Sequence, residues 1–163
     1  MVLFLEKGSH SLKLLAADSS GPNIDWISIQ ALGPSPPNES PITRPTPNEP
    51  PTNMETVMYE PKDALAYKVD ILQMNSGYQG GGYADYQGFG SYLSWTIEAP
   101  MTGEHEIVAR YAARKSRPAD LLVDGLKRET FPFSSSGQWT NWRQETMVLF
   151  LEKGSHSLKL LAA

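Results

Sequence analysis

The 163-residue chain has no cysteine, an excess of acidic over basic residues, and no long apolar run. Without cysteine, neither a disulfide framework nor a thiolate metal site can form. The net charge of −4 argues against a nucleic-acid partner, because binding phosphates requires a basic face. The apolar start MVLFL ends at Glu6, too short for a signal-peptide core or a membrane span. We therefore expect no membrane partner, and we expect that Met1 is not a natural N-terminus.

The same seventeen residues, MVLFLEKGSHSLKLLAA, occur at 1–17 and again at 147–163. The second copy starts 146 positions after the first (147 − 1 = 146), which is a sensible length for one domain plus a linker. We interpret the chain as part of a tandem array with this repeat, cut out of register with its domain boundaries. A permuted or engineered module with a duplicated segment is the alternative. Within each copy, VLFL and HSLKLLA joined by EKGS predict a β-hairpin.

A proline-rich segment separates two parts of the chain. Residues 33–53, GPSPPNESPITRPTPNEPPTN, contain eight prolines and no aromatic residue, so we expect an extended linker over 33–54. Asn38 begins an N-glycosylation sequon. The threonines Thr43, Thr46 and Thr52 lie among prolines, a composition typical of O-glycosylated secreted stalks. A glycosylated linker would indicate a secreted protein, whereas the alternative is a bare spacer.

Outside the linker the pattern is that of short β-strands. Runs such as TIEAP, HEIVARYAA and DLLVDG alternate or are β-branched, and no stretch sustains a helical period. The sequence therefore predicts an all-β sandwich or barrel.

The repeat implies that the strands of one module are split across the two ends of the chain. Residues 1–32 would be the C-terminal strands of a preceding module, and 55–163 a β-sandwich that lacks its last strand. Residues 18–32 of the same or of a neighbouring chain would complete it. Closure within one chain gives a monomer and closure between chains gives a head-to-tail filament; the sequence leaves both open.

Six motifs follow one another in a defined order when the chain is read through the repeat. They are YEPKDA (59–64), GGGYADYQGFGSYLSWTIEAP (80–100), ARYAARKSRPADLLVDG (109–125), SSGQWTNW (135–142), LEKGSHSLKLLA (151–162) and GPNIDWISI (21–29). In this order they resemble the carbohydrate-binding modules of family 35 and the related family 6. The resemblance implies a β-jelly-roll with non-catalytic sugar-binding loops along one edge, of a kind found in secreted proteins of carbohydrate metabolism.

Sugar sites pair an aromatic ring with amide or carboxylate hydrogen-bonding groups, because sugars have apolar faces ringed by hydroxyls. By the resemblance, Trp139 would be the stacking ring, Tyr86 its facing partner and Asn23 the amide. The alternative is that Trp139 caps the core and Tyr86 is an aromatic of the sheet face. A period of two puts Trp139 and Trp142 on opposite sides, one of them in the core and the other exposed.

Two further tryptophans and a basic cluster complete the candidate side chains. Trp26 and Trp95 lie within strand patterns and are expected to pack in the core. The basic cluster is Arg110, Arg114, Lys115 and Arg117. A solvated loop is its simplest interpretation, and contact with the carboxylate of a uronic acid is the other.

The resemblance also implies a structural calcium ion between the opening and closing strands. The corresponding residues are Glu60, Lys62 and Asp25. Calcium prefers six to eight oxygen ligands, and an ammonium at one ligand position would repel it. Lys62 therefore argues against the metal and favours a Lys62–Asp25 ion pair, with Glu60 and Asp25 as the ligands if calcium does bind.

Catalytic motifs are not found. His10 and His156 are the same repeat position, and His105 begins a strand pattern; no Ser-His-Asp order, phosphate loop or metal-ligand histidine spacing occurs. We expect a non-catalytic module that serves as the repeat unit of a secreted array or extracellular fibre, with neighbouring copies as partners, since perfect repetition favours reuse of one packing interface. The competing functions are avid polysaccharide binding and an accessory module of a glycan-degrading enzyme.

Overall fold

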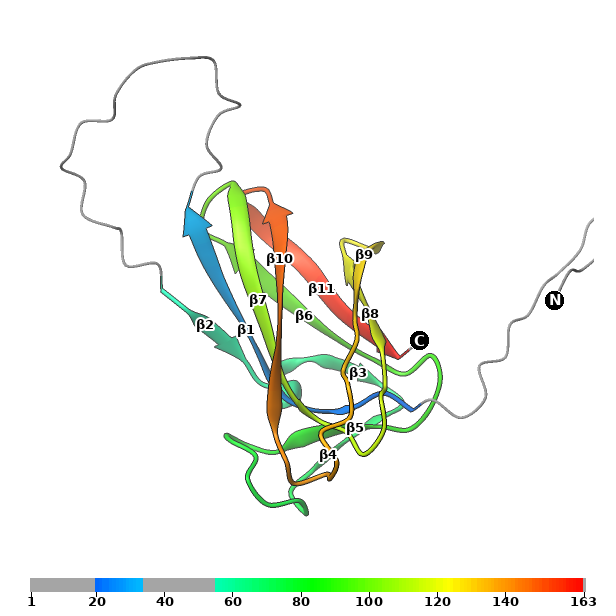
Figure 1. Ribbon diagram of the computed structural model, residues 1–163. Helices are drawn as coiled ribbons and strands as arrows, with labels where there is room; N and C mark the ends of the chain where they lie inside the picture. Colours follow the sequence, from blue (N-terminus) through cyan, green and yellow to red (C-terminus); the bar gives the residue numbers. More distant parts are fainter. Residues whose placement is uncertain (1–19, 34–54, 163) are drawn as a thin grey trace, which may run out of the picture.

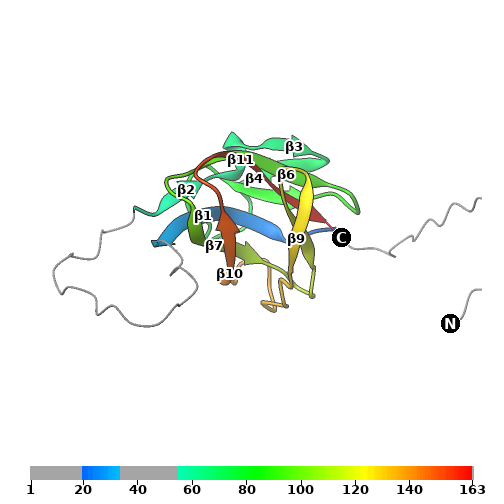
Figure 2. The same cartoon turned by 90° about the horizontal axis from the view of Figure 1, so that it is seen from above.

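A computed structural model of the chain, which describes residues 20–33 and 55–162, consists of two antiparallel β-sheets packed face to face (Figures 1 and 2). The first sheet has the strand order β10-β7-β1-β5-β4, and β2 also pairs with β1. Its strands are β10 (Arg143–Leu151), β7 (Gly103–Ala112), β1 (Asn23–Gly33), β5 (Tyr83–Tyr86), β4 (Val69–Leu72) and β2 (Val57–Tyr59).

The second sheet has the strand order β3-β6-β11-β8-β9. Its strands are β3 (Leu65–Tyr67), β6 (Tyr92–Ala99), β11 (Gly154–Ala162), β8 (Ala119–Val123) and β9 (Leu126–Phe131). A 3-10 turn, η1 (Pro61–Asp63), lies between β2 and β3. The prediction of an all-β jelly-roll sandwich is confirmed.

Alternation of residue types builds the core. In β6 the side chains of Leu93, Trp95, Ile97 and Ala99 are buried, and the residues between them face outward. The Trp95 indole N–H donates to the Glu60 carbonyl at 2.9 Å, which ties the core to the start of η1. Trp26 is also buried, so both tryptophans expected in the interior lie there.

Strand β1, from the front of the chain, lies in the middle of a sandwich otherwise built by residues 55–162. It pairs with β7 along most of its length, with β5 at its start and with β2 further along. In both views the end of β11 lies beside the start of β1 (Figures 1 and 2). In the numbering of the repeat, Ala162 corresponds to Ala16, so only three residues would separate β11 from Ser20 in a continuous array.

The second copy of the repeated segment, which the structure describes over 147–162, is not the β-hairpin that the sequence predicted. β10 pairs with β7 in one sheet, whereas β11 lies between β6 and β8 in the other. The turn at residues 152–153 therefore crosses between the layers as a β-arch. The prediction was wrong because an arch and a hairpin have the same alternating pattern, and only the choice of pairing partners distinguishes them.

A histidine holds this arch against the turn between β8 and β9. The His156 Nδ1 lies 2.7 Å from the Asp124 carboxylate, and its Nε2 lies 2.8 Å from the Glu152 carbonyl. Both partners are acceptors, so only the doubly protonated ring satisfies both bonds. The Asp124 carboxylate accordingly raises the pKa of His156. This histidine therefore has a structural role.

Candidate functional site

Two loops and the entry to β1 meet at one end of the sandwich. The loop between β7 and β8 and the loop between β9 and β10 are fastened to each other through Ser136. Its backbone N–H donates to the Ala113 carbonyl at 2.7 Å, and its hydroxyl accepts from the Ala113 N–H at 3.0 Å. Asn141 donates to the Ser136 carbonyl at 2.6 Å. These bonds hold the two loops against each other.

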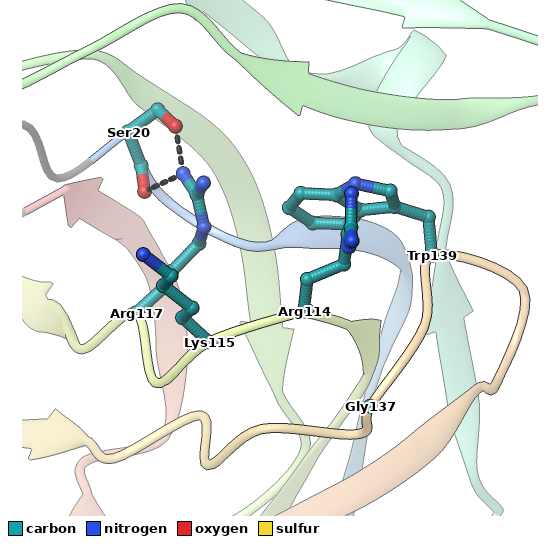
Figure 3. Close-up of a pocket in the computed structure, with 6 residues that line it drawn as sticks. All are labelled: Ser20, Arg114, Lys115, Arg117, Gly137 and Trp139. Atoms are coloured by element: carbon teal, nitrogen blue, oxygen red, sulfur yellow. Dashed lines mark hydrogen bonds between the residues drawn. The ribbon is translucent and has the colours of Figure 1, made fainter.

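A cavity of about 620 Å³ opens between these loops (Figure 3). It is lined by Ser20, Arg114, Lys115, Arg117, Gly137 and Trp139. Three of these residues are cations and one is an indole, and the lining residues in the described part of the chain include no carboxylate. The cavity therefore combines an aromatic surface with a positive potential.

Arg117 contacts both the Trp139 ring and the entry to β1. Its guanidinium carbon lies 5.0 Å from the centroid of the Trp139 ring, within the range of a cation–π contact. The same guanidinium donates to the Ser20 carbonyl at 2.6 Å and to the Ser20 hydroxyl (Figure 3). Trp139 also packs against the edge of the core. The indole is therefore fixed in place, and the entry to β1 is joined to the loop that carries Arg117.

Two buried polar atoms next to this region lack a hydrogen-bond partner among the described residues. They are Nε of Arg117 and the side-chain oxygen of Asn23, which is 3% exposed. A buried polar group without a partner costs free energy, so such groups are uncommon unless water or a ligand completes them.

Similarity to known proteins identifies the family of the chain. No family model matches the sequence. A family 35 carbohydrate-binding module from Clostridium thermocellum shares 31% identity with a TM-score of 0.63, over 66% of this chain and 85% of that module. The chain belongs to the family 35 carbohydrate-binding modules.

Two further relatives of this family 35 module bear on its function. An exo-beta-D-glucosaminidase from Amycolatopsis orientalis is 31% identical over 112 residues, 66% of this chain. The chain spans only 11% of that enzyme's length. A module described as Xyl-CBM35 in complex with a glucuronic acid-containing disaccharide shares 26% identity with a TM-score of 0.55, over 61% of this chain and 76% of that one.

The family 35 module does not bring all three predicted sugar-binding residues together. Trp139 lines the cavity, whereas Asn23 lies three residues after Ser20 and is not among the lining residues. Tyr86 is 2% exposed, and its hydroxyl donates to the Leu160 carbonyl at 3.2 Å, with burial raising its pKa. The alternation of β5 turns this ring into the core, so it does not face Trp139.

A period of two predicted that one of Trp139 and Trp142 lies in the core and the other is exposed, and this prediction is wrong. Both are half-buried, because residues 139–142 form a loop in which strand alternation does not apply. The Trp142 ring lies 5.5 Å from the Tyr83 ring and 5.4 Å from the Arg110 guanidinium carbon. Its indole N–H donates to the Ser76 carbonyl at 2.9 Å. Trp142 thus supports the loop before β5.

Of the basic cluster, only three members reach the cavity. Arg110 instead forms an ion pair with Asp25, which is 0% exposed. The Gln79 N–H also donates to both oxygens of this carboxylate, at 2.9 and 3.1 Å. Burial raises the pKa of Asp25, and the Gln79 N–H and Arg110 oppose that rise.

The expected Lys62–Asp25 ion pair is therefore wrong, because Arg110 takes the place beside Asp25. Lys62 pairs with Asp63 at 2.9 Å and lies 3.7 Å from an oxygen of Glu60. That Glu60 oxygen accepts from the Gly81 N–H at 2.9 Å. Within residues 20–33 and 55–162, no group of three or more His, Asp or Glu side chains is arranged to hold a metal. The residues present do not fit calcium, since a guanidinium pairs with Asp25 and an ammonium lies beside Glu60, and both would repel the ion.

Several sequence predictions lie outside the described residues. These are the first copy of the repeated segment and the glycosylation positions Asn38, Thr43, Thr46 and Thr52. Within the described ranges, no helix is long and apolar enough to cross a membrane.

Proposed function

We propose that this module is non-catalytic and binds acidic polysaccharide, with a uronic acid residue in the cavity beside Trp139. The observation that carries the proposal is the pairing of an indole with Arg114, Lys115 and Arg117 around one cavity. The ring would stack on the apolar face of a sugar, and the cations would attract its carboxylate. A neutral sugar would gain from the first interaction alone.

One further observation supports an acidic ligand. The neighbour Xyl-CBM35 was solved with a disaccharide that contains glucuronic acid. Because the related glucosaminidase is an enzyme many times longer than this chain, an accessory role beside a secreted glycan-degrading domain is the natural setting for such binding.

The test is calorimetric titration with an oligogalacturonate and with a neutral xylo-oligosaccharide of equal length. In low salt we expect the acidic ligand to bind at least about tenfold more tightly, and we expect 0.5 M NaCl to remove most of that difference. Arg114→Gln should weaken binding of the acidic ligand, whereas Arg128→Gln, which removes an exposed cation of β9, should not. Equal affinity for both ligands at both salt concentrations would contradict an acidic ligand.

A second proposal concerns assembly: the module is the repeat unit of a secreted array, with sugar on Asn38, Thr43, Thr46 or Thr52 of its linker. Two observations favour it, the identical segments 147 − 1 = 146 positions apart and the end of β11 lying beside the start of β1. The covalent connection between β1 and the rest of its sandwich runs through residues 34–54. The β1 strand of one chain could therefore complete the sheet of a neighbouring copy, which would join the two copies into a fibre.

Engineered cysteines test this exchange directly, because the natural chain has none. Ser28 of β1 faces Val108 of β7 as a cross-strand partner. We expect an equimolar mixture of Ser28→Cys and Val108→Cys chains, unfolded and refolded together and then oxidised, to yield disulfide-linked dimers. The double variant serves as the control for closure within one chain. Monomers alone in the mixture, together with an efficient internal disulfide in the double variant, would rule out exchange.

A further inference from the structure

Four charged side chains lie where the loop before β5 meets the body of the sandwich, and Asp25, Glu60 and Arg110 bind the loop backbone. Two are the carboxylates of Asp25 and Glu60, and two are the cations Arg110 and Lys62. They come from β1, from the residue before η1, from β7 and from η1. Each of the two carboxylates accepts from the loop backbone and lies near a cation, and Lys62 also pairs with the exposed carboxylate of Asp63.

The Asp25 half of this arrangement is buried. Its carboxylate accepts from the Gln79 N–H of the loop, and Arg110 pairs with one of its oxygens. The other guanidinium nitrogen of Arg110 donates to the Gly77 carbonyl at 3.0 Å. Arg110 therefore connects the closing strand to the loop, as a metal ion bound to both would.

The Glu60 half lies directly against the loop backbone. The Glu60 carboxylate accepts from the Gly81 N–H at 2.9 Å, with the Lys62 ammonium 3.7 Å from the same oxygen. A Cβ placed on Gly80 would lie 2.7 Å from the Glu60 carboxyl carbon, and one on Gly81 would lie 3.0 Å from Cδ of Lys62. Gly80 therefore disfavours a side chain, because its φ is +73° and the Glu60 carboxyl fills the adjacent space, whereas at Gly81 the Lys62 chain would have to shift.

We propose that Arg110 and Lys62 take over the role that the resemblance assigns to calcium, so that this module folds and keeps its loop in place without a metal ion. A divalent cation between Asp25 and Glu60 would meet a guanidinium and an ammonium that are already there, and these like charges would repel it. The fixed cations cannot be removed by a chelator, whereas a bound metal can.

The test measures thermal unfolding in 5 mM EDTA and in 5 mM CaCl₂, together with a calorimetric titration of calcium alone. For the wild-type chain we expect the same Tm in both solutions and no heat of binding. Lys62→Glu restores a second carboxylate beside Glu60, and we expect its Tm to rise by at least about 4 °C when calcium replaces EDTA.

Lys153→Glu is the matched control, since it makes the same change of charge in the exposed turn between β10 and β11. We expect it to respond to calcium no more than the wild type does. The proposal is overturned by stoichiometric calcium binding to the wild-type chain, or by a Tm of the wild type that rises with calcium. It is also overturned if Lys62→Glu folds and responds to calcium no more than Lys153→Glu, because Lys62 would then not stand in the place of the metal.

Discussion

Replacing Asp25 with alanine is expected to lower the free energy of unfolding by about 3–5 kcal/mol, the range for breaking a buried ion pair by removing one partner. Asp25 is 0% exposed and the Arg110 side chain only 16%, so the variant would leave a guanidinium in a place that water barely reaches. The Gln79 N–H would lose its acceptor as well. Urea denaturation followed by tryptophan fluorescence measures the change.

The control for Asp25→Ala is Asp63→Ala, which removes a carboxylate that pairs with Lys62 at the surface. There we expect little change in the unfolding free energy, because solvent screens exposed pairs. Combining Asp25→Ala with Arg110→Met should recover part of the lost stability, since no unpaired charge then remains buried. Equal losses for Asp25→Ala and Asp63→Ala would show that the Asp25–Arg110 pair does not stabilise the fold.

The fold of this module was largely predictable because its strands follow a local rule. Alternation in the segments that became β6 and β7 is visible without any structure, and the order of the motifs then indicated a jelly-roll. The pairing partners of each strand were harder to predict from the sequence. VLFL and HSLKLLA satisfy a hairpin and an arch equally well, and packing of β10 on β7 decided between them. Pairing depends on the whole sandwich, which no short stretch encodes.

The candidate site was predictable only in part, for a related reason. Trp139 lies in a loop after Gly137, and the resemblance marked it as a stacking ring, whereas its place in the lining of the cavity came only from the fold. Arg117 is hydrogen-bonded to Ser20, 97 positions away in the sequence, and Arg110 is paired with Asp25, 85 positions away. A local sequence pattern therefore cannot assign these partners. From the sequence, the four basic residues between positions 110 and 117 form one cluster. Only the fold separated Arg110, which has a buried partner, from the three cations that line the cavity.

The largest loss of ligand affinity is expected for Trp139→Ala, at least about 30-fold, the effect of removing an aromatic residue at the centre of a binding site. The indole is the aromatic surface of the cavity, and Arg117 stacks on it at 5.0 Å. Removing the ring takes away the apolar contact with the sugar and also frees Arg117 to move. Trp139→Phe should keep part of the affinity, because a smaller ring still offers a face. Titration with oligogalacturonate, well below the Tm of each variant, measures these effects.

Phe150→Ala is the matched control, because Phe150 is an exposed aromatic of the same strand-and-loop unit near the far end of β10. Phe150 lies seven positions after Arg143 (150 − 143 = 7), about 23 Å further along the strand. Its loss should leave affinity for the acidic ligand unchanged. If both alanine variants bind as the wild type does, the cavity beside Trp139 is not the sugar site. If Trp139→Ala loses affinity for the neutral and acidic ligands by the same factor while Arg114→Gln weakens only the acidic one, the ring and the cations contribute separately. The ring would then give the module its affinity for sugar in general, and the cations its preference for a uronic acid.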